Sequence, residues 1–333
     1  MDMLNWLKEI KMNKLSLPLI CKVSANELQV SVKDMLCDAD IMAKCVASAV
    51  ERYNTPLALM PFDSTIEAEL FGCEVLFSNC EMPTISNMPF SMRVEHPLSN
   101  LRMPKIGVGR SGIVFEAIKK VKETIVEKPL FAYCLGPFTL AAKLFSLEDI
   151  LFICDEDPDL MDELMEKLTF FITEYILHLK SAGADGVFID ESAAGNIHPS
   201  LNAEYSAPFM TKIVAETQNK NFIAIHHTAG EKVSRQIGNI LDTECKIYHF
   251  GEGTDLADIS NFIPDETIFM GNVSGDCFIN DNIECLENAV ADLIKCCGGR
   301  ENFIPSTCDI PYNANPNCVE KFISLTKNFY EGK

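Results

Sequence analysis

Histidine, cysteine and carboxylate side chains follow the ends of several short apolar segments in this sequence. The candidates are His227, Cys308 and the adjacent acidic pair Asp190 and Glu191. Imidazole, thiolate and carboxylate together form the ligand set that proteins use for zinc. Side chains alternate between the two faces of a strand, so only one residue of the acidic pair, and only one of His226 and His227, can face a common centre. The residues alone leave two interpretations open, a metal site and a set of hydrogen-bonded structural side chains.

The elements that must position these residues alternate between strand and helix from about residue 40 onward. Short apolar runs suit buried strands, and apolar residues spaced by three or four positions suit helices packed on a core. Strict alternation requires a parallel sheet with right-handed crossovers, and the length and even spacing favour a closed barrel over an open doubly wound sheet. We predict seven strands, at residues 57–60, 130–134, 186–189, 222–225, 247–250, 267–270 and 303–304.

The predicted fold class is therefore α/β, a (β/α)8 TIM-type barrel with an N-terminal extension and an inserted loop excursion. Five prolines punctuate the excursion, which we place between residues 61 and 110. The 333 residues contain no tandem repeat and no Gly/Ser linker, which predicts a single domain over 1–333. Catalytic groups of such barrels lie at the carboxyl ends of the strands, where the candidate residues occur.

Charge and hydropathy exclude several classes of ligand. The net charge of −20 repels polyanions, so we expect no nucleic acid and no anionic membrane as partner. The longest uncharged apolar stretch, Pro129–Ala142, has two prolines and is too short to cross a bilayer. Charged residues precede any apolar run at the N-terminus, which predicts a cytoplasmic protein. In that compartment the fourteen cysteines are expected to act mainly as small apolar core residues.

Two further motifs, one of glycines and one of cysteines, are weaker indications of function. Gly107, Gly109 and Gly112 have the spacing of a dinucleotide-binding turn, but no good strand precedes them and no acidic residue ends a second strand at the required distance. We interpret them as a flexible entry to the next helix. The vicinal Cys296-Cys297 pair ends a predicted helix, which indicates packing rather than redox chemistry.

Several short motifs occur in a fixed order along the chain from about residue 30 to the C-terminus. They are Phe62-Asp63, Glu67-Ala68-Glu69, Gly72-Cys73-Glu74, Gly136-Pro137-Phe138-Thr139, Gly183-Ala184-Asp185-Gly186, His227-Thr228-Ala229-Gly230, Gly271-Asn272-Val273 and Cys308-Asp309-Ile310-Pro311. This set resembles the uroporphyrinogen decarboxylase superfamily, and more closely its corrinoid-dependent methyltransferase branch. The resemblance implies the same (β/α)8 barrel, Asp63 and Glu191 as catalytic residues, and Asn272 and Phe138 as cofactor contacts.

The decarboxylase branch carries an arginine-rich N-terminal segment that binds the acidic side chains of its substrate. Residues 17–23 of this chain contain no arginine, and the first arginine is Arg52. A polycarboxylate would also meet a chain of net charge −20. These differences favour the methyltransferase branch.

In that branch zinc is held by the His and Cys of a His-x-Cys-Gly motif and by a Cys near the last strand. His227 and Cys308 match two of these positions, whereas Ala229 replaces the middle cysteine. Glu191 or Asp190 could supply the missing ligand, and a carboxylate makes zinc a stronger Lewis acid. We expect zinc held by His227, Cys308 and Glu191.

The expected function is transfer of a methyl group between a small methylated compound or thiol and a corrinoid carried by a separate partner protein. The alternatives are a decarboxylase of a tetrapyrrole or other acid, and a non-catalytic subunit that binds a corrinoid or tetrapyrrole.

Overall fold

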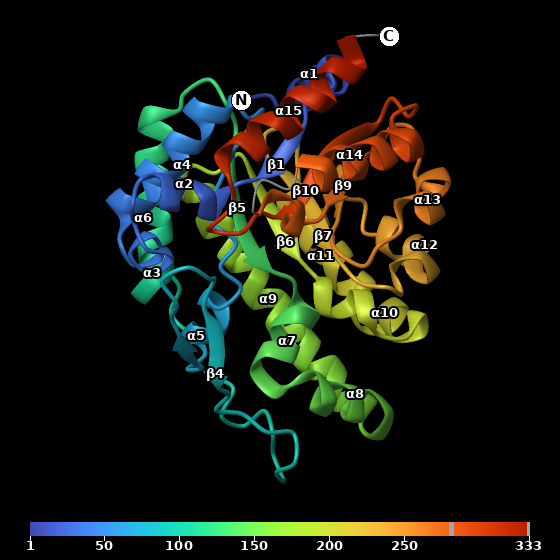
Figure 1. Cartoon of the computed structure of the whole chain (residues 1–333). Helices are drawn as coiled ribbons and strands as arrows, with labels where there is room; N and C mark the ends of the chain where they lie inside the picture. The colour runs from blue at the N-terminus through green and yellow to red at the C-terminus, as the bar shows by residue number, and fades with distance from the viewer. Residues whose placement is uncertain (280–282, 332–333) are drawn as a thin grey trace.

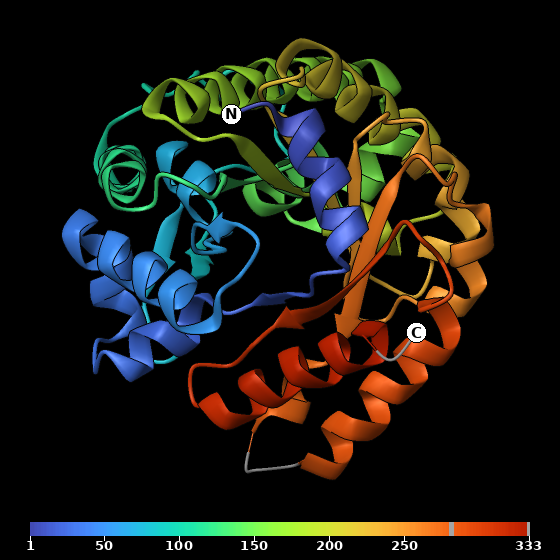
Figure 2. The same cartoon turned by 90° about the horizontal axis from the view of Figure 1, so that it is seen from above.

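Eight parallel strands curl into a nearly closed barrel surrounded by helices in the computed structural model, which describes residues 1–279 and 283–331 (Figures 1 and 2). The order of hydrogen-bonded neighbours is β1-β10-β9-β8-β7-β6-β5-β2. This confirms the predicted TIM-type (β/α)8 class. The barrel strands are β1 (Leu17–Leu19), β2 (Ala58–Leu59), β5 (Leu130–Leu135), β6 (Gly186–Asp190), β7 (Ile223–Thr228), β8 (Ile247–Phe250), β9 (Ile268–Val273) and β10 (Phe303–Asp309).

Helices form the outer layer, in which apolar side chains pack against the strands and against neighbouring helices. The longest, α9, begins at Pro158 behind an Asp157 carboxylate that accepts a hydrogen bond from the Leu160 amide, and it ends before Gly183 at φ +119°, as its sequence predicts. Besides α9 (Pro158–Ala182), the helices around the barrel are α2 (Cys21–Glu27), α3 (Val32–Cys37), α4 (Ala39–Tyr53), α6 (Gly109–Thr124), α7 (Pro137–Phe145), α8 (Leu147–Glu156), α10 (Pro199–Tyr205), α11 (Ala207–Thr217), α12 (Ile237–Leu241), α13 (Leu256–Ile259), α14 (Ile283–Cys297) and α15 (Pro316–Glu331).

The N-terminal helix α1 (Met3–Asn13) closes the amino-terminal end of the barrel and lies across it in Figure 2. Its Trp6 is buried, packs against Phe131 with ring centroids 5.5 Å apart, and donates its indole N–H to the Pro56 carbonyl over 3.3 Å. Inward-facing residues of the strands join Trp6 in one apolar cluster inside the barrel. The opposite, carboxyl-terminal end is therefore the end open to a ligand.

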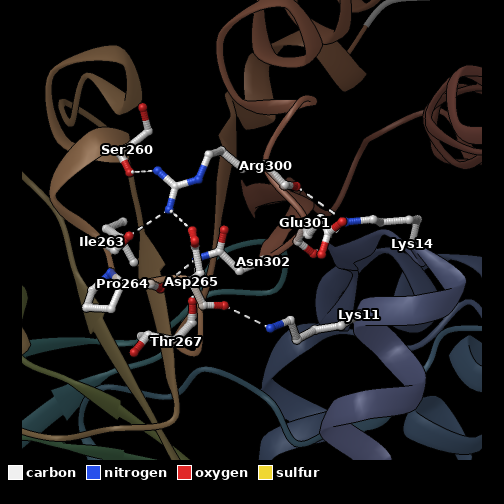
Figure 3. Close-up of polar contacts among 10 residues, drawn as sticks. All are labelled: Lys11, Lys14, Ser260, Ile263, Pro264, Asp265, Thr267, Arg300, Glu301 and Asn302. Carbon is white, nitrogen blue, oxygen red and sulfur yellow. Dashed lines mark hydrogen bonds and ion pairs between the residues drawn. The ribbon is translucent and has the colours of Figure 1, made fainter.

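Polar contacts tie α1 to the loops that precede β9 and β10 (Figure 3). Lys11 donates to the Asp265 carbonyl over 2.8 Å, and Lys14 donates to the Arg300 carbonyl over 3.3 Å. Arg300 in turn donates to two carbonyls within 260–263 and to the Asp265 carboxylate. Because basic side chains satisfy backbone carbonyls here, this network fixes the closed end of the barrel.

Two features differ from the sequence-based expectation. The barrel has eight strands rather than seven, since the N-terminal segment contributes the short β1, in which Pro18 lacks an N–H donor and hides the strand pattern. The 61–110 excursion contains regular structure, namely α5 (Ile66–Leu70) and an antiparallel hairpin of β3 (Glu74–Leu76) and β4 (Thr84–Asn87). The hairpin lies at the end of the molecule opposite to α1 in Figure 1.

Most cysteines are buried free thiols, as expected for small apolar core residues. Cys277 and Cys285 form a disulfide, which the sequence had not predicted. Within the described part of the chain, no helix has both the length and the hydrophobicity to cross a membrane.

Candidate functional site

A cavity of about 290 Å³ opens at the carboxyl ends of the barrel strands. Strand ends and the loops after them supply the lining, as expected for this fold. The lining residues are Leu19, Phe62, Ser64, Met82, Tyr133, Phe188, Asp190, His227, Ala229, His249, Gly251, Glu252, Cys308 and Asp309.

Asp190, His227 and His249 occupy facing positions on β6, β7 and β8 and form a row across the cavity. His227 Nδ1 lies 2.8 Å from His249 Nδ1, and His249 Nε2 lies 3.1 Å from the Thr307 carbonyl oxygen. A carbonyl only accepts, so His249 Nε2 must donate; neutral His249 then accepts at Nδ1 from the Nδ1–H of His227. This assignment leaves the lone pair of His227 on Nε2.

Burial sets the charge state of this row. Desolvation lowers the pKa of His227, although Asp190 and the His249 carbonyl oppose the change. Burial lowers the pKa of His249 well below its usual range, and the neighbouring His227 lowers it further. For Asp190, burial acts to raise the pKa, but His227 and hydrogen bonds from Ser192 and Tyr133 together lower it. The row therefore combines neutral imidazoles with an ionised carboxylate at neutral pH.

Tyr133 and Gly251 shape the surroundings of the row. The Tyr133 hydroxyl donates to Asp190 Oδ2 over 2.6 Å and fixes the carboxylate. A Cβ on Gly251 would lie only 2.8 Å from His227 Cε1, so glycine leaves room for the imidazole. His226 faces the other side of β7, where its Nδ1 lies 3.1 Å from the Thr243 hydroxyl. Strand alternation thus places one histidine of the pair inward, as expected.

Cys308 lines the cavity from the end of β10, and its thiol contacts the Asn272 carbonyl at 3.8 Å. Burial raises its pKa to about 12, and Glu252 and Asp309 add to the rise. Burial therefore keeps the thiol protonated well above neutral pH.

Glu191 lies outside the cavity in which we expected it to bind a metal. Its buried carboxylate accepts hydrogen bonds from the amides of Phe138 and Thr139, at 3.0 and 2.9 Å, and from the Ser206 hydroxyl at 3.0 Å. It thereby caps the N-terminus of α7, and a Cβ on Gly136 would collide with it. Burial raises its pKa to about 7. Asp190, not Glu191, is the carboxylate that reaches the cavity.

The other expected site residues, Phe138, Asn272 and Asp63, do not line the cavity. Phe138 is fully buried in the outer core, and its side chain does not line the cavity. The Asn272 amide donates to the carbonyls of Gly251 and Thr254, at 3.1 and 2.7 Å, and supports the loop after β8. Asp63 is buried in an ion pair with Arg110 and accepts from the Thr65 hydroxyl over 2.6 Å.

The residues present do not assemble the expected zinc site. His227 and Cys308 line one cavity, but Ala229 offers no thiolate and Glu191 is committed to α7. Across residues 1–279 and 283–331, no three His, Cys, Asp or Glu side chains are grouped to hold one metal ion.

The sequence had not assigned roles to His249, Tyr133 or Glu252. His249 and Tyr133 each lie one residue before the end of a predicted strand, so the strand-end pattern could have indicated both. Glu252 lies in a loop, where no periodic signal marks the direction of a side chain.

The barrel and its polar cavity define a TIM-type fold with a site at the carboxyl end of the strands. The family model "Uroporphyrinogen decarboxylase (URO-D)" matches residues 18–329, and the chain belongs to this family. A solved methyltransferase from Methanosarcina mazei shares the fold, with a TM-score of 0.82, 18% identity and coverage of 95% of this chain and 94% of that chain.

Relatives in the two branches are about equally similar. A uroporphyrinogen decarboxylase from Koribacter versatilis is 28% identical over 56% of this chain and 54% of its own length. The methylcobamide:CoM methyltransferase MtbA of Methanosarcina mazei is 27% identical over 58% of this chain and 57% of its own length. The chain thus spans little more than half the length of these relatives, and the two relatives have different activities. The choice between decarboxylase and methyltransferase therefore depends on the residues of the cavity.

Proposed function

We propose that this protein is a corrinoid-dependent methyltransferase, which moves a methyl group between a small methylated compound and a corrinoid bound to a separate partner protein. The relative MtbA supports this branch by its name, methylcobamide:CoM methyltransferase. The acidic lining of the cavity is the observation that favours a methyltransferase over a decarboxylase of a polycarboxylate.

Among the described residues, the side chains that line the cavity include three carboxylates, on Asp190, Glu252 and Asp309, and no lysine or arginine. A substrate with several carboxylates would be repelled there, because like charges interact strongly where solvent screening is weak. The volume of about 290 Å³ is also near the lower limit for pockets that hold drug-sized ligands, and is small for a four-ring macrocycle. Both properties favour a small substrate over uroporphyrinogen.

The residues of the cavity have separable roles in this proposal. Phe62 and Phe188, with ring centroids 4.9 Å apart, form an apolar wall that excludes water from the methyl group. His227 offers the Nε2 lone pair to a proton or hydrogen-bond donor of the substrate, and Asp190 holds a negative charge beside it. The corrinoid, when its protein docks over the barrel mouth, supplies the cobalt that accepts or gives the methyl group.

A direct test follows the visible absorption of cobalamin in the presence of the purified protein. We expect cob(I)alamin to be consumed with one of a panel of methylated amines, ethers and thioethers, at a rate that falls at least tenfold in His227→Ala. His178→Ala, which changes an exposed histidine of α9, serves as the matched control.

A decarboxylase of a tetrapyrrole or other acid is the second candidate, supported by the Koribacter versatilis relative. Release of CO₂ from uroporphyrinogen without any cobalt signal would replace our proposal by this candidate. Tight cobalamin binding with neither reaction would instead indicate a non-catalytic binding subunit.

A further inference from the structure

In the part of the chain that the structure describes, every charged side chain that lines the cavity at the carboxyl end of the barrel is acidic, and aromatic rings line the same space. Asp190 ends β6, Glu252 follows β8, and Asp309 ends β10, so the carboxylates come from different sectors of the barrel. An acidic cavity with aromatic walls favours a ligand of positive charge, because carboxylates attract it and ring faces stabilise it through their quadrupoles.

Lys22, which pairs with one of the lining carboxylates, does not neutralise the cavity. Lys22 is buried, lies outside the lining, and pairs with Asp309 Oδ2 at 3.0 Å and Glu81 Oε2 at 3.4 Å. The other oxygen of Asp309, Oδ1, is buried and has no hydrogen-bond partner among the described residues. Lys22 therefore offsets one carboxylate at most, and Asp309 keeps one buried acceptor oxygen that is unpaired among the described residues.

The aromatic part of the lining is a packed group of three rings. Phe62 lies 5.1 Å from Tyr133 and 4.9 Å from Phe188 between ring centroids. Phe188 also packs on the imidazoles of His227 and His249, each at 5.3 Å. These contacts fix the rings before a ligand arrives, so binding costs little side-chain entropy.

We propose that the cavity binds a small methylated organic cation, of the quaternary or tertiary ammonium class, as its methyl donor. The assignment of this cation as a methyl donor rests on the proposed function. The binding of a cation is argued from the lining of the cavity alone. The net charge of −20 of the whole chain attracts the same class of ligand from solution.

The charge of such a donor also suits the transfer step. The C–N bond breaks, nitrogen keeps the bonding electron pair, and the amine leaves as a neutral molecule. The methyl group passes to the reduced cobalt of the corrinoid, which contributes both electrons of the new bond. Because the product has lost its positive charge, its attraction to the carboxylates weakens and its release is favoured.

The test compares choline with its neutral carbon isostere, 3,3-dimethylbutan-1-ol, by titration calorimetry of the full chain in the presence of a metal chelator. We expect choline to bind at least tenfold more tightly than the alcohol, and mercaptoethanesulfonate, a small anionic thiol, to bind more weakly than either. Equal affinity for choline and the alcohol, or tighter binding of the anion, overturns the proposal.

Variants separate the contribution of the carboxylate charge to choline binding from the contribution of the aromatic ring. Asp190→Asn keeps the size of the side chain and removes its charge, so the affinity for choline should fall about tenfold while that for the alcohol stays unchanged. Phe62→Leu should weaken choline binding several-fold and leave alcohol binding nearly unchanged. Glu231→Gln, an exposed carboxylate outside the lining, is the control and should change neither.

The cobalt assay distinguishes failure of this inference from failure of the proposed function. Consumption of cob(I)alamin with ethers or thioethers, but with no ammonium compound, keeps the methyltransferase and overturns the cationic donor. Choline binding that depends on Asp190, without methyl transfer from any compound, keeps the cation site and overturns the methyltransferase.

Discussion

The buried carboxyl group of Glu67 should make the stability of the fold decline as pH rises. Glu67 lies on α5, accepts a hydrogen bond from the Leu135 amide over 3.2 Å, and has its second oxygen buried without a partner among the described residues. Burial raises its pKa from 4.5 to about 8, although hydrogen bonds from its own amide and that of Leu135 oppose the rise. The folded state therefore holds the proton more tightly than the unfolded state.

The stability from this group is full below pH 4.5 and is lost as pH rises toward 8. Each pH unit in that window changes the free energy of unfolding by about 1.4 kcal/mol, so the loss is at most about 5 kcal/mol. Glu67→Gln removes the titration and keeps the shape. Relative to the wild type, the variant should gain several kcal/mol between pH 5 and pH 9.

Urea denaturation followed by circular dichroism at pH values from 5 to 9 measures this gain. Glu123→Gln, an exposed carboxylate on α6, is the matched control and should give a curve parallel to that of the wild type. Parallel curves for Glu67→Gln and the wild type would refute the argument that burial holds this carboxyl group in its protonated form.

Three further substitutions test other parts of the structure. Glu191→Ala leaves two amides and a hydroxyl without their acceptor, so thermal denaturation should show a loss of about 3 kcal/mol or more; an unchanged Tm would contradict the helix-capping role. Trp6→Ala should destabilise the protein by about 3–5 kcal/mol in the same measurement, and a loss under 1 kcal/mol would contradict the closure of the barrel by α1. Ala229→Cys adds a thiol to the cavity that contains His227 and Cys308, so the variant should retain more zinc after dialysis than the wild type; equal zinc contents by mass spectrometry would contradict the view that a third ligand is missing.

The sequence predicted the barrel well because alternation of strand and helix is a strong local signal. It missed β1, since three residues with a central proline do not show the periodicity of a strand. The pairing of β1 with β10 joins residues nearly 290 positions apart, and no local pattern reports such a contact.

For the site, alternation correctly predicted that only one histidine of the 226–227 pair faces the cavity. The same rule left Asp190 and Glu191 undecided. In the structure the amides of α7 bind the Glu191 carboxylate, whereas Asp190 lines the cavity. Phe138, expected from the sequence as a cofactor contact, likewise lies outside the lining of the cavity. The chain turns into α7 at Pro137, and the helix then directs Phe138 into the outer core.

The central claim is that a methyl group leaves a small substrate in this acidic cavity and passes to a corrinoid. The most direct measurement incubates the protein anaerobically with choline labelled with ¹³C in its N-methyl groups and with cob(I)alamin, and follows the label by NMR. Our account predicts that the methyl signal moves from nitrogen to cobalt, and that the transfer slows about tenfold in Asp190→Asn. A label that stays on nitrogen, together with CO₂ release from uroporphyrinogen by the same preparation, would contradict it.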